Sequence, residues 1–140
     1  MTLVIDASIA AKWFVAEDGR EQALQVLDLP GRQAPDLIVA EVANVVWKKA
    51  VRGQVTDAQA RAICAALPRY FETLHPSEAL VESAIGIGLA LRHPVYDCLY
   101  LACAMRLGTR LVTAHQRLIA AVADSEFADL AVHIDASVSD

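Results

Sequence analysis

The stretch Thr2-Leu3-Val4-Ile5-Asp6 is a short apolar and β-branched run that ends at an acidic residue. Further segments that we expect to be strands lie at residues 71–75, 110–113 and 130–134. Short, continuous apolar runs are typical of parallel strands that are covered on both faces. Because helical periodicity fills the intervals, the pattern predicts an α/β fold: a three-layer α/β/α sandwich around a parallel sheet of four to five short strands.

The spacing of apolar residues and the capping residues locate the helices between these strands. Pro35 is expected to open the longest helix, Thr56 and Ser77 to serve as N-caps, and Gly108 to end an apolar helix that follows Pro94. No repeat or linker interrupts the pattern, which predicts a single domain over residues 1–140. The expected helices lie at 7–15, 19–29, 35–52, 57–67, 80–91, 95–107 and 115–123.

Composition and charge exclude several classes of protein. The chain has 140 residues, of which 56% are hydrophobic and 21% charged, so an extended disordered protein is excluded. The net charge is −5, and residues 124–140 carry five acidic residues and no Lys or Arg. Residues 1–123 are therefore neutral, which argues against tight nucleic-acid binding through a large basic surface. An enzyme that acts on nucleic acid is still compatible with this balance.

The cysteines and the hydropathy pattern point to the cytoplasm. Cys64, Cys98 and Cys103 are odd in number and have no CxxC spacing, so free thiols in a reducing compartment are expected rather than a disulfide framework or a zinc site. The apolar residues 1–5 are too few for a signal peptide, and no uncharged apolar run approaches the ~18 residues of a membrane span. We therefore expect a cytoplasmic protein without a membrane segment.

Two acidic residues stand at places where an α/β protein can bind a ligand. Asp6 directly follows the first expected strand, and ligands of open α/β sheets bind outside the carboxyl ends of the strands. Asp97 lies near the start of a helix that is apolar all round and should be buried. Each also has a purely structural explanation, since Asp6 is a good N-cap and Asp97 complements a helix dipole. Taken one at a time, these residues favour the structural explanation.

Glu41 is harder to explain by structure alone, because its helical neighbours Leu37, Ile38 and Val45 are apolar. A carboxylate on an apolar stripe is costly unless it is paired or binds a cation. The pairing partner would be Lys48, two turns along the same helix. The functional explanation is a metal ion that relieves the repulsion among Asp6, Glu41 and Asp97. Oxygen ligands without a His/Cys set favour Mg²⁺ or Mn²⁺ over Zn²⁺.

Four segments resemble the motifs of PIN-domain ribonucleases, and of the small VapC-type toxins in particular. They are LVIDAS at 3–8, IVAEVAN at 38–44, YDCLYLA at 96–102 and GTRLVTAH at 108–115. The resemblance implies an endoribonuclease in which Asp6, Glu41 and Asp97 hold one or two Mg²⁺ or Mn²⁺ ions and which leaves a 5′-phosphate and a 3′-hydroxyl. It also implies the toxin role in a toxin–antitoxin pair, a homodimer, and an antitoxin whose basic tail covers the acidic pocket.

One position departs from the family pattern, because His115 stands where an acidic residue is usual. Imidazole can bind Mn²⁺ or position water, but it adds no negative charge. A metal role for His115 and a simple place at a helix N-terminus both stay open, as does the number of ions. Ser8, Asn44 and Thr113 are candidates to orient ligands or substrate. The alternatives are a PIN-like protein-binding module without catalysis and, from a third class, a metal-dependent phosphatase.

Overall fold

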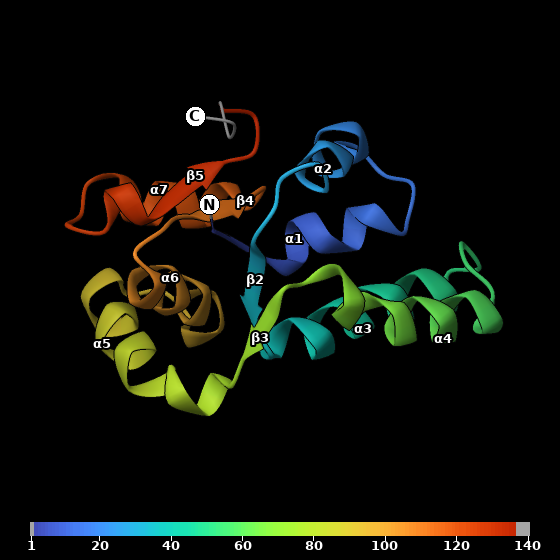
Figure 1. Ribbon diagram of the computed structural model, residues 1–140, viewed down its shortest axis with the longest axis horizontal. Coiled ribbons are helices and arrows are strands. Elements are labelled where there is room, and N and C mark those ends of the chain that lie inside the picture. The colour runs from blue at the N-terminus through green and yellow to red at the C-terminus, as the bar shows by residue number, and fades with distance from the viewer. Residues whose placement is uncertain (1, 137–140) are drawn as a thin grey trace.

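The computed structural model describes residues 2–136, which form five strands and seven α-helices (Figure 1). Four short 3₁₀ turns, at Ala11–Trp13, Leu67–Tyr70, Ser77–Ala79 and Ala128–Leu130, join or extend them. In chain order the elements are β1 (Leu3–Ile5), α1 (Ala7–Ala10), α2 (Arg20–Val26), β2 (Arg32–Pro35), α3 (Leu37–Val51), α4 (Asp57–Ala66), β3 (Thr73–His75), α5 (Val81–Leu91), α6 (Val95–Leu107), β4 (Leu111–Thr113), α7 (Gln116–Ala123) and β5 (Ala131–His133).

The five strands form one parallel sheet in the order β3-β2-β1-β4-β5. Helix α6 contacts β1, β2 and β4, and α5 packs against α6. In Figure 1, α5 and α6 lie on one side of the central strands, and α1 to α4 lie on the other. The sequence prediction of a three-layer α/β/α sandwich with a parallel sheet is therefore confirmed.

The core is centred on β1, β4 and α6. Every residue of β1 and β4 is buried, and α6 is buried continuously from Cys98 to Ala104. A helix that is apolar all round has no face for water, which is why it takes the central position against the sheet. The interpretation of this helix from its sequence is confirmed, as are its end at Gly108 in the left-handed conformation and its start after Pro94.

The prediction that Pro35 opens a helix is wrong, because Pro35 is the last residue of strand β2 and α3 begins at Leu37. This strand was missed because RQAP has no apolar run. Side-chain hydrogen bonds compensate for its polar residues. The amide of Gln33 meets the ring of His75 on β3, and the Arg32 guanidinium donates to three backbone carbonyls, those of Leu27, Leu29 and Tyr70.

Of the two predicted helix N-caps, one is confirmed and the other is wrong. Thr56 caps α4 in a capping box with Gln59, as predicted. Ser77 does not cap α5, because α5 begins only at Val81. The Ser77 hydroxyl instead donates to Asp36 Oδ1 over 2.6 Å and accepts from the backbone N–H of Leu37 over 3.1 Å. It thereby ties the end of β2 to the turn after β3.

The first two helices are shorter than expected. The helix expected over 7–15 is α-helical only at Ala7–Ala10 and continues as the 3₁₀ turn Ala11–Trp13, and α2 spans Arg20–Val26 rather than 19–29. Within residues 2–136, none of the helices has the length and apolar character needed to cross a membrane.

Candidate metal-binding active site

The carboxyl ends of β1 and β4 meet at the point where the strand order changes direction. From β1 the chain first adds β2 and β3 on one side, and later β4 and β5 on the other. Ligands of open α/β sheets bind in the crevice at such a switch point. Ile5 pairs with Val112, so Asp6 and Thr113 come next to each other at this edge. The Thr113 hydroxyl donates a hydrogen bond to Asp6 Oδ2.

Asp6 is buried, with 4% of its surface exposed, and it has two roles at once. Its Oδ1 accepts from the Ile9 backbone N–H over 3.3 Å, which makes it the N-cap of α1. The same oxygen accepts from the Ser8 hydroxyl over 2.6 Å. Burial raises the pKa of Asp6, the bonds from Ser8, Thr113 and Ile9 oppose this rise, and the charge of Asp97 adds to it. The capping explanation and the site explanation are therefore compatible for this residue.

Glu41 lies half-buried on α3, and its Oε1 accepts a hydrogen bond of 2.5 Å from the Tyr100 hydroxyl of α6. Among residues 2–136, no ion pair joins it to Lys48, so the expected structural partner is not the one found. Burial raises the pKa of Glu41, Tyr100 lowers it, and the charges of Asp97 and Asp6 raise it again. Burial and the Glu41 charge in turn raise the pKa of Tyr100 far above its ordinary value, so its hydroxyl stays a donor.

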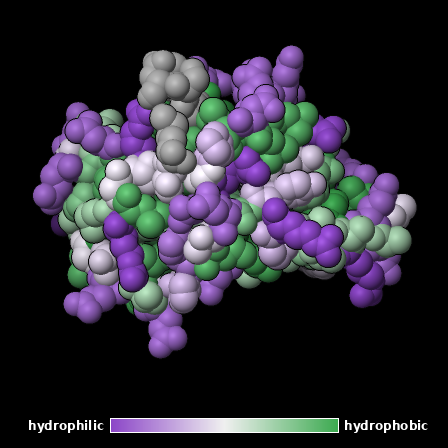
Figure 2. Space-filling model, viewed as in Figure 1, coloured by the Kyte–Doolittle hydropathy of each residue, from purple (hydrophilic) through white to green (hydrophobic). Residues whose placement is uncertain are grey.

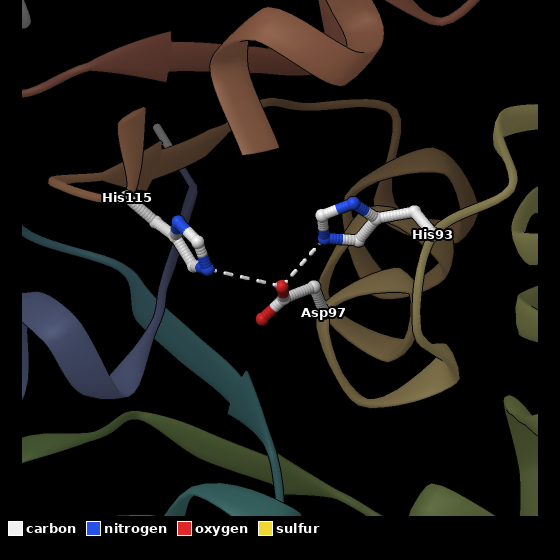
Figure 3. Close-up of side chains that lie close together, drawn as sticks. All are labelled: His93, Asp97 and His115. Carbon is white, nitrogen blue, oxygen red and sulfur yellow. Dashed lines mark hydrogen bonds and ion pairs between the residues drawn. The ribbon is translucent and has the colours of Figure 1, made fainter. Parts of the chain in front are cut away.

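Asp97 lies in the first turn of α6, and two histidines hold one of its oxygens (Figure 3). His93 Nε2 lies 2.7 Å and His115 Nε2 lies 3.2 Å from Asp97 Oδ2. His93 precedes α6, whereas His115 follows β4 and occupies the N-cap position of α7 without a side-chain capping bond. The His115 ring thus points at Asp97.

These side chains line a pocket of about 600 Å³. The Lys12 ammonium, which also lines it, pairs with Glu17 over 3.2 Å, and Lys49 pairs with the other oxygen of Glu17 over 3.3 Å. The acidic lining is therefore only partly neutralised. The pocket is bounded by Asp6, Ala7, Ser8, Ala11, Lys12, Glu17, Leu37, Ala40, Glu41, Asn44, Val45, Tyr96, Asp97, Tyr100 and His115.

The three carboxylates fit a hard divalent cation. The charge of Asp97 raises the pKa of both Asp6 and Glu41, so the carboxylates lie close enough to repel one another. A cation in their midst removes this repulsion, and the carboxylate oxygens are ligands that Mg²⁺ and Mn²⁺ prefer. Mg²⁺ usually keeps several waters, which suits a pocket wider than a closed ligand cage.

The candidates for orienting roles all lie at this pocket. Ser8 bonds to Asp6 and also accepts from the Ala114 backbone N–H over 3.0 Å. Thr113 bonds to Asp6 from the end of β4 and accepts from the His115 backbone N–H over 3.0 Å. Asn44 lines the pocket from α3, one turn after Glu41. The structure thus brings together every residue that the sequence suggested.

Sequence reasoning missed His93 and Tyr100, although both had a weak signal. His93 stands four residues before Asp97 and Tyr100 three residues after it, and these spacings place side chains on one face of a helix. His93 lies before Pro94, outside the expected helix, and Tyr100 sits in an apolar helix where an aromatic residue is ordinary. Only the fold shows that both contact carboxylates of the pocket.

Sequence comparisons connect the chain with known ribonucleases. It is 33% identical to Ribonuclease VapC3 of Pyrobaculum aerophilum over 121 residues, which are 84% of this chain and 92% of the relative. It is 37% identical to Ribonuclease VapC1 of Mycobacterium tuberculosis over 91 residues, which are 63% of this chain and 65% of that relative.

The fold has a counterpart among solved structures. The crystal structure of PAE2754 from Pyrobaculum aerophilum superposes with a TM-score of 0.66 at 21% identity, over 96% of this chain and 90% of that one. At this level of sequence identity, the structural match is evidence for the fold alone. The family model described as PIN domain matches residues 3–131. With its parallel sheet, its pocket at the switch point and these relatives, the chain belongs to the PIN-domain family, among the homologues of the VapC ribonucleases.

Proposed function

We propose that this protein is a Mg²⁺- or Mn²⁺-dependent endoribonuclease, that the whole chain 1–140 is one PIN domain, and that it is the toxin of a toxin–antitoxin pair. The observation that carries the enzymatic part is the convergence of Asp6, Glu41 and Asp97 on one pocket at the switch point of the sheet. The relatives named as ribonucleases support the choice of RNA as substrate. The toxin role rests on the same relatives.

In this proposal Asp6, Glu41 and Asp97 hold the metal ion. The bound ion would lower the pKa of a water molecule and neutralise charge on the scissile phosphate. Each carboxylate is held by other side chains of the chain. Ser8 and Thr113 fix Asp6, Tyr100 fixes Glu41, and two histidines fix Asp97. Such fixed carboxylates reduce the reorganisation that would otherwise accompany substrate binding.

The balance of charges in the pocket supports catalysis without tight RNA binding. Lys12 is the basic side chain in the lining, and it is occupied by Glu17. A metal-free pocket would repel a phosphodiester and would attract a basic segment. We therefore propose that RNA engages through the bound metal and that a basic segment of an antitoxin protein covers the same pocket.

We also propose that the protein acts in the cytoplasm as a homodimer. Val81, Ile85 and Leu89 recur every four residues along α5 and are 44%, 47% and 76% exposed. Such a stripe of exposed apolar side chains is typical of a surface that packs against a partner. On the face shown in Figure 2, hydrophobic groups also reach the surface between hydrophilic ones.

RNA cleavage with purified protein tests the enzymatic part. The wild type should cleave single-stranded RNA in Mg²⁺ or Mn²⁺ and lose this activity in EDTA. Asp6→Asn should be inactive, whereas the matched control Asp36→Asn should keep full activity, because Asp36 follows β2 but bonds to Ser77 outside the pocket. If Asp6→Asn cleaved RNA as fast as the wild type, Asp6 would not belong to the catalytic site. Hydrolysis of a chromogenic phosphate monoester under the same conditions would support the phosphatase alternative.

A protein-binding module without catalysis is the second candidate, and His115 is the observation that favours it. With an imidazole at this place the pocket has one negative charge fewer than the family pattern provides. Titration calorimetry with Mn²⁺ separates the two candidates. Binding that is lost in Asp6→Asn supports the enzyme, and no binding at millimolar Mn²⁺ supports the module.

A further inference from the structure

A second set of potential metal ligands lies beside the three carboxylates. Among residues 2–136, His93, Asp97 and His115 are the group of three whose ligand atoms all lie within 4.8 Å of one another. Figure 3 shows both rings directed at one oxygen of Asp97, from opposite sides. The three carboxylates of the pocket do not form such a close group. The densest cluster of ligand atoms therefore contains two nitrogens and one oxygen.

The backbone holds His93 tightly in this position. Arg92 ends α5 in the left-handed conformation with φ 54°, which turns the chain sharply towards α6. The His93 backbone N–H then donates to the Gly88 carbonyl over 3.1 Å. A Cβ on Gly88 would lie 3.0 Å from the His93 carbonyl oxygen, so glycine permits this close approach. The ring is consequently placed before any ligand arrives.

The opposite ring is placed by the sheet. His115 follows β4 by two residues, and its backbone N–H donates to the Thr113 hydroxyl, which itself bonds to Asp6. The side chains of His93, Asp97 and His115 are 10%, 22% and 36% exposed. The cluster is thus framed by buried structure on the His93 side and open to solvent on the His115 side, which gives an ion a path of entry.

We propose that His93, Asp97 and His115 bind a divalent transition-metal ion of the Zn²⁺ class. Imidazole nitrogen suits Zn²⁺, Co²⁺ and Ni²⁺, whereas Mg²⁺ prefers oxygen. At metal–nitrogen distances of ~2.0–2.1 Å, an ion between the rings needs small shifts of the three side chains. The ion would bind the unprotonated Nε2 atoms and the Asp97 carboxylate, so its binding would release any proton that these ligand atoms carry. Three protein ligands leave a further coordination position for water or a phosphate oxygen.

Asp97 belongs to both sets of ligands, so the two sites are coupled. An ion held by the histidines draws the Asp97 carboxylate towards it and away from Glu41 and Asp6. Occupation of this site would therefore change the affinity of the carboxylate pocket for Mg²⁺. Binding of the transition metal itself needs no ribonuclease activity, so the proposal stands or falls separately from the function proposed above.

Calorimetry with ZnCl₂, CoCl₂ and MgCl₂, each added alone, tests the proposal. The background is Cys64→Ser, which removes a half-exposed thiol that could bind Zn²⁺. We expect one equivalent of Zn²⁺ to bind. His93→Gln and His115→Gln should weaken it by more than the ~10- to 100-fold that is usual for a residue that only orients a ligand. His133→Gln is the matched control, because His133 lies with Gln116 and Asp135 and should bind as the background does.

Asp6→Asn separates the two sites, because it should lose Mg²⁺ binding and keep the Zn²⁺ equivalent. On binding, the visible absorption of Co²⁺ should show nitrogen coordination, and nitrogen NMR should show shifts at Nε2 of two histidines. Unchanged Zn²⁺ affinity in both glutamine variants would overturn the proposal, as would the absence of Zn²⁺ binding in the background protein. A loss of Zn²⁺ affinity of no more than ~100-fold would instead assign the rings to orienting Asp97 and would overturn the proposal. His115→Gln keeps the test valid if His93→Gln does not fold.

Discussion

Thr113 donates a hydrogen bond to Asp6 across 107 positions of the chain, and this bond joins the ends of β4 and β1 at the centre of the sheet. It is one of three bonds that lower the pKa of a carboxylate which burial would otherwise raise. The same hydroxyl accepts from the backbone of His115. One side chain therefore favours the ionised form of Asp6 and also bonds to the segment that carries the second imidazole.

Thr113→Val removes this bond without changing the shape of the residue. We expect stability to fall by about 1 kcal/mol and the Mg²⁺ affinity at pH 7 to fall by about tenfold, because the Asp6 carboxylate loses a donor. Calorimetry and urea denaturation measure the two effects. Thr73→Val, at an exposed position of β3, is the matched control. Equal Mg²⁺ affinities in Thr113→Val and the wild type would show that Asp6 does not depend on this donor.

Asp6→Asn should stabilise the metal-free protein at pH 7. Folding raises the pKa of Asp6 above its ordinary value of 3.8, so the ionised form destabilises the fold at any pH above the folded pKa. Asparagine carries no charge, so the substitution removes this destabilisation. Urea denaturation in EDTA at pH 7 should show the gain. The gain should narrow as the pH falls through the folded pKa and should be smallest below 3.8, where the wild-type carboxyl is protonated in both states.

Mg²⁺ affinity should decrease as the pH falls below neutral. Protons compete with the ion for Asp6 and Glu41, whose pKa values are both raised, so the competition begins at a higher pH than for ordinary carboxylates. Calorimetry at pH 8, 7, 6 and 5 should show a progressive loss, with protons released on binding. A constant affinity across this range would contradict the raised pKa values of the two carboxylates.

Tyr100→Phe should sharpen this pH dependence. The phenol lowers the pKa of Glu41, so its removal raises that pKa further. We expect the loss of Mg²⁺ affinity, relative to the wild type, to grow as the pH falls from 8 to 5, because protons compete more strongly for a Glu41 carboxylate of higher pKa. Tyr70→Phe serves as the control, because Tyr70 packs in the aromatic cluster around Trp13. A pH-independent loss would point to a packing defect instead.

Leu89→Glu should convert the proposed dimer to a monomer. Leu89 is 76% exposed on α5, so the substitution costs little in a monomer, but it would bury a charge in an interface. Analytical ultracentrifugation measures the change, and Leu24→Glu, at a 38% exposed position of α2, controls for added charge. A wild-type protein that sediments only as a monomer would contradict the proposed dimer, and a variant that remains dimeric would exclude this face.

The sequence predicted structure best in segments that are uniformly apolar, and it suggested site residues best where an acidic residue stands next to such a segment. Continuous apolar runs predicted β1 and β4, and the apolar helix α6 was placed at the centre for the same reason. Asp6, Glu41 and Asp97 were suggested because each follows a strand or lies among apolar residues. Their neighbours in the pocket could be anticipated from the PIN-like motifs that contain them.

Sequence patterns failed where tertiary contacts replace local propensity. Strand β2 contains Arg32 and Gln33, whose polar groups are satisfied in part by Tyr70 and His75, far along the chain, so no local run marks it. Ser77 looked like a helix cap, but its hydroxyl donates to Asp36, the residue that follows β2. His93 became a site residue only because a sharp turn brings it over Asp97. The contacts of β2 and Ser77 have no fixed spacing in the sequence, and the four-residue spacing of His93 and Asp97 is only a weak signal.

The position of β4 in the sheet also bears on when the pocket can exist. β4 pairs with β1, the first strand, yet it consists of residues 111–113 of a 140-residue chain. A nascent polypeptide that ends before Leu111 lacks the strand beside β1, the hydroxyl that holds Asp6 and the ring at His115. During synthesis the protein would therefore carry no assembled carboxylate pocket until most of its length had left the ribosome. Under the proposed function, truncated products that end before β4 would lack the pocket on which RNA cleavage depends.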